Sequence, residues 1–123
     1  MHLKHKYRVG DMANAYADLI VDQNVRYVSN WSLSDDLGNA IPLTDATITA
    51  QVRKFPGGNL LLDISQYVTI TNAANGTLQI DIPSDILATL NAGKYLWDML
   101  ITYTNQTRYK VAGTFTVTGT ITE

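Results

Sequence analysis

Apolar and polar residues alternate along most of this chain, and the longest alternation runs from Thr107 to Thr122. One side of that stretch is aromatic, aliphatic or glycine, and the other side is threonine at every position from Thr114 onward. A period of two places successive side chains on opposite faces of an extended backbone, so the pattern predicts a β-strand. A strand of this length would outgrow a small domain, and we therefore expect a bulge or bend near Gly113.

Shorter alternating segments precede this strand, and each ends at residues that favour turns. The clearest turns are Asp36–Asn39, Pro56–Gly58 and Asn75-Gly76, where glycine or proline suits the backbone angles of a tight turn. A single helical turn is expected over Asp85–Leu90, directly after Pro83. Roughly seven to nine short antiparallel strands joined by such turns predict an all-β fold, a sandwich of two sheets.

The composition limits the possible functions. The chain has 123 residues, enough for one domain, of which 46% are hydrophobic and only 16% charged. It contains no cysteine, which excludes disulfides, thiolate metal sites and thiol nucleophiles. The net charge of −2 argues against nucleic acid as a partner, because phosphate backbones are bound by clustered Lys and Arg. No apolar run approaches the ~20 residues that span a bilayer, so we expect no membrane partner.

The first ten residues differ in charge from the rest of the chain. They hold three basic residues, two histidines and no acid, whereas the remaining residues hold six basic and eleven acidic side chains. We expect residues 1–16 to form an extended docking arm that becomes ordered on a partner, and residues 17–123 to form the sandwich domain. The arm residues expected to contact that partner are Lys4, His5, Lys6, Tyr7 and Arg8.

Candidate catalytic groups are few. His2 and His5 are the only imidazole bases, and both lie in the arm. A hydrolase needs a nucleophile, a base and an oxyanion site held together, so we expect no enzyme activity, no cofactor and no metal centre. Asp35 and Asp36 are adjacent carboxylates, but their place beside a glycine favours a solvated turn over glycoside chemistry.

Asp98 would lie in the middle of a strand, between Trp97 and Met99. A buried carboxylate without a partner is costly, so Asp98 either points outward or pairs with Arg108 or Lys110 on the following strand. We predict that Asp98 and Arg108 form a structural ion pair across the hairpin.

The threonine side of the last strand is a second candidate surface, formed by Thr114, Thr116, Thr118 and Thr120. A flat strand edge without charges invites pairing with other chains unless it is covered. We expect this row to be an exposed edge or a partner face, which indicates assembly with other chains.

Aromatic residues offer a different function. At strand positions they are expected in the core: Tyr27, Trp31, Tyr95, Trp97, Tyr103, Tyr109 and Phe115. If Trp31 or Trp97 were exposed instead, its ring would suit a carbohydrate-binding or host-adhesion module.

Several short motifs share an order with a known group of proteins. They comprise Trp31, Asp36, Gly38 and Pro42-Leu43-Thr44, then Gln51 and Arg53, then Ala88, Leu90, Ala92-Gly93, Tyr95 and Asp98, and finally Arg108, Gly113 and Val117. In this order they resemble the small immunoglobulin-like proteins and domains found among phage tail and baseplate genes, including the N-terminal domain of phage baseplate upper proteins. The resemblance covers the chain from Asp18 to Glu123.

This resemblance implies an immunoglobulin-like β-sandwich in which the turn at Gly93 sets the entry of a strand that begins near Tyr95. It also implies a structural role without catalysis in a virion, as a tail, baseplate, neck or capsid accessory protein made in the host cytoplasm. The partners would then be other virion proteins, with several copies of this chain or a homo-oligomer in the assembly. Fold alone does not fix function, and the carbohydrate-binding or adhesion module remains the alternative.

Overall fold

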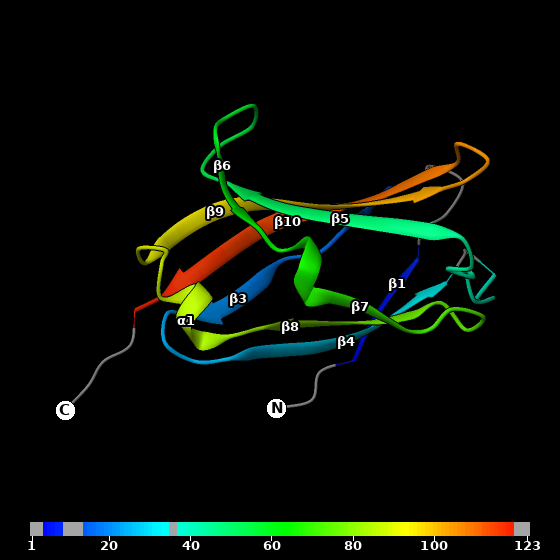
Figure 1. Cartoon of the computed structure of the whole chain (residues 1–123), viewed down its shortest axis with the longest axis horizontal. Coiled ribbons are helices and arrows are strands. Elements are labelled where there is room, and N and C mark those ends of the chain that lie inside the picture. Colours follow the sequence, from blue (N-terminus) through cyan, green and yellow to red (C-terminus); the bar gives the residue numbers. More distant parts are fainter. Residues whose placement is uncertain (1–3, 9–13, 35–36, 120–123) are drawn as a thin grey trace.

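The computed structural model describes residues 4–8, 14–34 and 37–119, which form two β-sheets packed face to face (Figure 1). The smaller sheet has the order β1 (Lys4–Arg8), β4 (Tyr27–Ser34), β8 (Thr77–Ile82) and β7 (Val68–Asn72). The larger sheet has the order β2 (Asn14–Tyr16), β10 (Arg108–Thr118), β9 (Gly93–Tyr103), β5 (Ala46–Arg53) and β6 (Leu60–Asp63), and β3 (Leu19–Asp22) also pairs with β10. The predicted all-β sandwich is confirmed.

The strand order is that of an immunoglobulin fold. Without β2, β3 and β6, the sheets are β1-β4-β8-β7 and β5-β9-β10, which correspond to the ABED and CFG sheets of such domains. The described residues include ten strands. Eight of them lie in residues 17–123, and the arm supplies the other two, β1 and β2. Three pairings are parallel rather than antiparallel: β1 with β4, and both β2 and β3 with β10.

The short helical elements lie at the ends of strands. The predicted helical turn is α1 (Ser84–Leu87), which Pro83 precedes in an extended conformation, and a 3-10 turn, η1 (Ser65–Tyr67), connects β6 to β7. Asn75 and Gly76 turn the chain between β7 and β8 as expected, and Gly76 has the positive φ of 67° that this turn requires. No helix in the described ranges is long and apolar enough to cross a bilayer.

Tyr95 forms the corner that leads into β9. Its hydroxyl donates a 2.6 Å hydrogen bond to the carbonyl oxygen of Asn91, four residues earlier, which is the tyrosine corner of immunoglobulin-like domains. In antibody domains a cysteine follows that tyrosine by two residues and forms a disulfide with the second strand of the fold. Here the equivalent position holds Trp97, and its ring packs edge-to-face on Trp31 from β4, with ring centroids 5.8 Å apart. An indole pair therefore links the two sheets between the strands that the disulfide joins in antibodies.

The core lies between the sheets and uses the inward side of each strand. Its largest fully buried side chains include Trp31, Phe115, Met99, Leu78 and Leu19. Tyr95 and Trp97 are also buried, and Tyr27, Tyr103 and Tyr109 pack against the core from its margin. The expectation that the aromatic residues belong to the core is confirmed for these positions.

Gly113 is the point where the chain crosses most closely over β10. A Cβ atom on Gly113 would lie 1.9 Å from the carbonyl oxygen of Ala17, the residue between β2 and β3. The Ala17 amide donates to the carbonyl oxygen of Ala112, and the Trp97 indole donates to that of Ala17. The pairing of β10 with β9 runs through Gly113 without a register shift, so the bulge expected there is wrong. The interruption falls in the neighbouring β2–β3 segment instead.

Candidate functional site

The outer face of the larger sheet carries a groove of about 930 Å³ over β5, β9 and β10. Strand pairing fixes which side chains form its floor, because residues opposite one another in the ladder point to the same face. Gln51, Asp98 and Ala112 form one cross-strand row, and Thr49, Leu100 and Lys110 form the next. The groove therefore combines charged, polar and apolar side chains.

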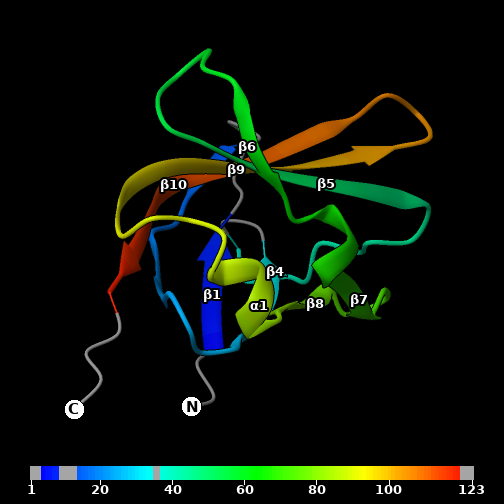
Figure 2. The ribbon, with the colours of Figure 1, turned by 60° about the vertical axis from the view of Figure 1, so that its left-hand side comes forward.

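Two exposed aromatic rings line the groove. Tyr16, at the end of β2, is 69% exposed, and Phe55, at the start of the β5–β6 turn, is 60% exposed. That turn projects from the larger sheet, on the side away from the smaller sheet (Figure 2). Gly57 has a positive φ of 72°, a conformation that suits glycine, so the Pro-Gly-Gly sequence explains why the chain turns here.

Sequence reasoning missed both rings as surface features. The exposure of Phe55 could have been predicted, because an aromatic residue directly before Pro56-Gly57-Gly58 lies in a turn, outside the alternating pattern that buries side chains in strands. The exposure of Tyr16 could not have been predicted from the sequence, because it depends on the pairing of β2 with β10. Leu96 and Leu100, the half-buried apolar residues of the floor, lie on the face of β9 opposite to the core.

The predicted ion pair between Asp98 and Arg108 is wrong. The ladder between β9 and β10 places Asp98 opposite Ala112 and places Arg108 opposite Thr102, four residues further along β9. Four residues of strand extend over about 13 Å, which is beyond the reach of the two side chains. Asp98 is half-buried, and its carboxylate has no hydrogen bond or ion pair with other residues in the part of the chain that the structure describes.

Basic residues gather on this same face. Arg53, Lys94, Arg108 and Lys110 share the outward side of β5, β9 and β10 with a single acid, Asp98, although the whole chain has a net charge of −2. Arg53 donates a hydrogen bond to the carbonyl oxygen of Gly58, whereas the Lys110 ammonium has no partner among the described residues. The face is electropositive relative to the molecule as a whole.

The threonine row is not an exposed edge. β10 pairs with β9 on one side and with β2 and β3 on the other, so it lies inside the sheet. The Asp18 carboxylate accepts hydrogen bonds from the amide and the hydroxyl of Thr114, and these lower the pKa of Asp18. Thr118 donates to the carbonyl oxygen of Val21. The edge interpretation is therefore wrong, Thr116 is half-buried on the same face, and Thr120 lies outside the described residues.

The arm is extended, but it pairs with the domain. Lys4, His5, Lys6, Tyr7 and Arg8 form β1, whose backbone runs parallel to residues 30–34 of β4. The side chains of these five residues lie outside the described part of the molecule. Backbone pairing in the smaller sheet orders this segment within the chain itself, and its docking role remains a prediction.

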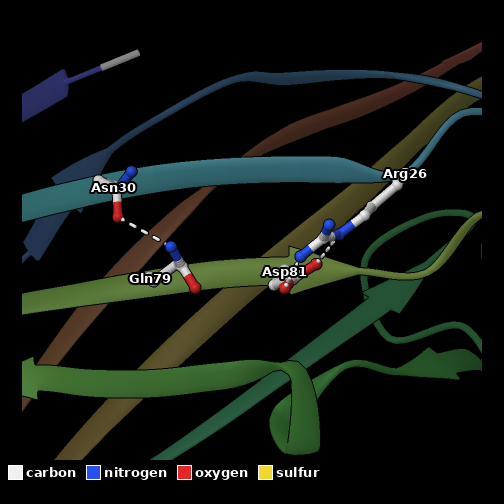
Figure 3. Close-up of polar contacts among 4 residues, drawn as sticks. All are labelled: Arg26, Asn30, Gln79 and Asp81. Atoms are coloured by element: carbon white, nitrogen blue, oxygen red, sulfur yellow. Dashed lines mark hydrogen bonds and ion pairs between the residues drawn. The ribbon is translucent and has the colours of Figure 1, made fainter. Parts of the chain in front are cut away.

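The outer face of the smaller sheet has a different character, because its polar side chains bind one another (Figure 3). Arg26 makes two hydrogen bonds of 2.8 and 2.6 Å to the Asp81 carboxylate, which lower the pKa of Asp81. Further along β4 and β8, the Gln79 amide donates to the side-chain oxygen of Asn30 over 3.2 Å. These contacts leave the larger sheet as the better surface for a partner.

Two further candidate sites can be assessed. Trp31 and Trp97 are 1% and 2% exposed, so the interpretation of either ring as an exposed sugar platform is wrong. The described ranges also contain no group of three or more His, Asp or Glu residues placed to hold a metal ion.

Comparison with known proteins identifies likeness at the level of fold only. No family model and no curated protein matches the sequence. The N-terminal domain of ORF48 from phage TP901-1 matches 96% of this chain and 99% of that domain, with a TM-score of 0.55 and 9% identity. A family 123 glycoside hydrolase from Clostridium perfringens has a TM-score of 0.50 and 13% identity, and the match spans 88% of this chain but only 23% of the hydrolase.

Proposed function

We propose that this chain is a non-enzymatic structural component of a bacteriophage virion, a tail, baseplate, neck or capsid accessory protein that acts through protein–protein contacts. Support for the phage assignment comes from the motif order described above and from a fold that one phage domain shares over nearly its whole length. The proposal places the chain in the virion, with other virion proteins as its partners.

The observation that carries the contact role is the groove on the larger sheet. Apolar surface is presented there by Tyr16, Phe55, Leu96 and Leu100. Beside it lie the charged groups of Asp98 and Lys110, which have no partner among the described residues. Exposed apolar surface with a polar surround is typical of protein interaction sites. On the outer face of the smaller sheet, by contrast, Arg26 is bound to Asp81 and Gln79 is bound to Asn30.

The test is quantitative mass spectrometry of gradient-purified particles from the phage that encodes this chain. Peptides of the chain should be present in fixed proportion to the major capsid and tail-tube proteins. A few copies per particle would favour the tail, neck or baseplate, and hundreds would favour the capsid. Absence from intact particles would overturn the proposal.

A carbohydrate-binding or host-adhesion module is the second candidate, now placed in the groove rather than at the tryptophans. Exposed Tyr16 and Phe55 could stack on sugar rings while Gln51, Arg53 and Asp98 bind hydroxyl groups. Glycan-array binding that Phe55→Ala abolishes, with Val25→Ala as the exposed apolar control, would favour this function. Binding that both variants retain would reject the groove as a glycan site.

A further inference from the structure

The centre of the groove carries one charge of each sign. Asp98 on β9 and Lys110 on β10 both point outward, and neither makes a hydrogen bond or an ion pair with another described residue. A ligand of a single sign, such as a phosphate backbone or an acidic peptide, would be repelled by one of these two groups. The groove therefore favours a partner that presents a carboxylate and an ammonium group together.

These two charges occupy one diagonal of a rectangle of outward-pointing side chains. The ladder between β9 and β10 places Asp98 opposite Ala112 and Leu100 opposite Lys110, so Leu100 and Ala112 occupy the other diagonal. Neighbouring strands lie about 5 Å apart and alternate residues of a strand about 7 Å apart, so the four side chains form a compact patch. The patch has charges at two opposite corners and apolar groups at the other two.

Such a patch is complementary to a copy of itself. A half-turn about the line through Leu100 and Ala112 exchanges the two charged corners. Asp98 of one copy then faces Lys110 of the second copy, and the reverse contact forms at the same time. Leu100 and Ala112 lie on the axis, where each meets its counterpart. Both charges that lack a partner in the described chain are therefore paired in such a dimer.

The residues around the patch fit the same arrangement. The axis lies about 36° from the strands, so the strands of the two copies cross at about 70°, nearer to orthogonal than to aligned sheet packing. Tyr16, which pairs beside Ala112, is brought near Leu96 of the second copy, and this contact covers its exposed ring. The other basic residues of the face lie in its outer rows, away from the axis: Arg53, Lys94 and Arg108.

We propose that the outer face of the larger sheet is the interface of a twofold-symmetric homodimer, in which the Asp98 carboxylate of each copy pairs with the Lys110 ammonium of the other. The inference rests on the proposed function, because it identifies a second copy of this chain as the partner of the groove. Each face is occupied by the other, so the contact is closed and association stops at two chains.

Sedimentation equilibrium of the purified full-length chain over a range of concentrations tests the dimer. The average mass should rise with concentration and level off at two chains. Lys110→Glu and Asp98→Lys should each weaken dimerisation by about tenfold or more, because each places like charges opposite one another in both contacts. Gln66→Glu and Gln66→Lys are the controls. They introduce the same side chains at an exposed residue of η1 and should leave dimerisation unchanged.

Mixing the two charge-reversed variants tests the geometry. In a mixed dimer every acidic side chain again faces a basic one, so an equimolar mixture should dimerise more strongly than either variant alone. A mixture that stays monomeric, or variants that dimerise as well as the unmodified chain, would overturn the inference. An unmodified chain that stays monomeric at the highest attainable concentration, or that grows beyond two chains, would also overturn it. Circular dichroism verifies that each variant is folded before the comparison.

These measurements separate the inference from the proposed function. A monomeric chain that is nevertheless present in purified particles would overturn the dimer and retain the virion role. A dimeric chain that responds to the charge reversals but is absent from particles would do the reverse.

Discussion

At the scale of single residues, Gly113 has a structural role that its neighbours cannot share. The absence of a side chain lets the carbonyl group of Ala17 approach β10, where it accepts the indole hydrogen bond of Trp97. The close approach thereby connects the β2–β3 segment to the aromatic pair between the sheets. A buried indole donor needs such an acceptor.

Gly113→Ala should destabilise the fold by about 3 kcal/mol, because the added Cβ would lie 1.9 Å from a backbone oxygen that cannot rotate away. Urea denaturation measures the change. Gly119→Ala is the matched control, since its Cβ would meet only Ala92 at an ordinary 3.7 Å, and the expected change is within about 0.5 kcal/mol. Equal stability of the two variants would contradict the close approach.

Asp98 illustrates how a partner changes the effect of a substitution. As a member of a buried pair its loss would cost about 1 to 3 kcal/mol, but Asp98 is half-buried and has no partner among the described residues. Asp98→Ala should therefore change the unfolding free energy by no more than about 0.5 kcal/mol. Asp18→Ala removes the acceptor of two Thr114 hydrogen bonds and should lower the urea midpoint. A large decrease in the unfolding free energy of Asp98→Ala would instead indicate that Asp98 is paired.

At the scale of elements, the first sixteen residues supply one strand to each sheet. β1 adds to the edge of the smaller sheet beside β4, and β2 adds to β10 in the larger sheet. The basic charge of the segment gave no indication of this, because strand addition uses backbone groups that every residue carries.

Deletion of residues 1–10 should lower the melting temperature by about 5 °C or more, because it removes β1 and uncovers the edge of β4. An arm that becomes ordered only on a partner, as the sequence suggested, would leave the melting temperature almost unchanged. Differential scanning calorimetry distinguishes the two expectations. Deletion of residues 1–3, which precede β1, is the control. An unchanged melting temperature for the longer deletion would mean that the arm contributes little to the fold.

At the scale of the whole molecule, we expect the stability of the fold to decrease at acidic pH. The pKa values of Asp18, Asp63 and Asp81 are lowered below the ordinary 3.8, mainly by hydrogen bonds from Thr114, Ser65 and Arg26 respectively. A lowered folded-state pKa means that the unfolded chain takes up protons first as the pH falls. Each carboxylate therefore contributes stability above its unfolded pKa, and that stability is lost as the pH falls through the folded value.

The urea midpoint should accordingly be constant between about pH 7 and 5 and fall below about pH 4. Asp81→Asn, which removes the carboxylate from the Arg26 pair, should flatten part of that fall. Val25→Ser, which alters an exposed residue without a carboxylate, is the control and should leave the profile unchanged. A midpoint that rises as the pH falls from 5 to 3 would contradict the lowered values.

The sequence by itself determined the fold class, the approximate number of strands, the turn at Asn75-Gly76 and the apolar side of the last strand. These properties follow from backbone geometry within a few residues, where alternation and turn preference act directly. The tyrosine corner at Tyr95 was also predictable, because its partner Asn91 lies only four residues away.

Only the tertiary structure decided the properties that depend on which strands are neighbours. The register between β9 and β10 separated Asp98 from Arg108, and the pairing with β2 and β3 placed the threonine row inside a sheet. The same pairings exposed Tyr16 and brought Phe55, Leu96 and Lys110 to one groove. A shift of one residue in register would move every side chain of a strand to the other face, and no local pattern specifies such pairings between distant segments.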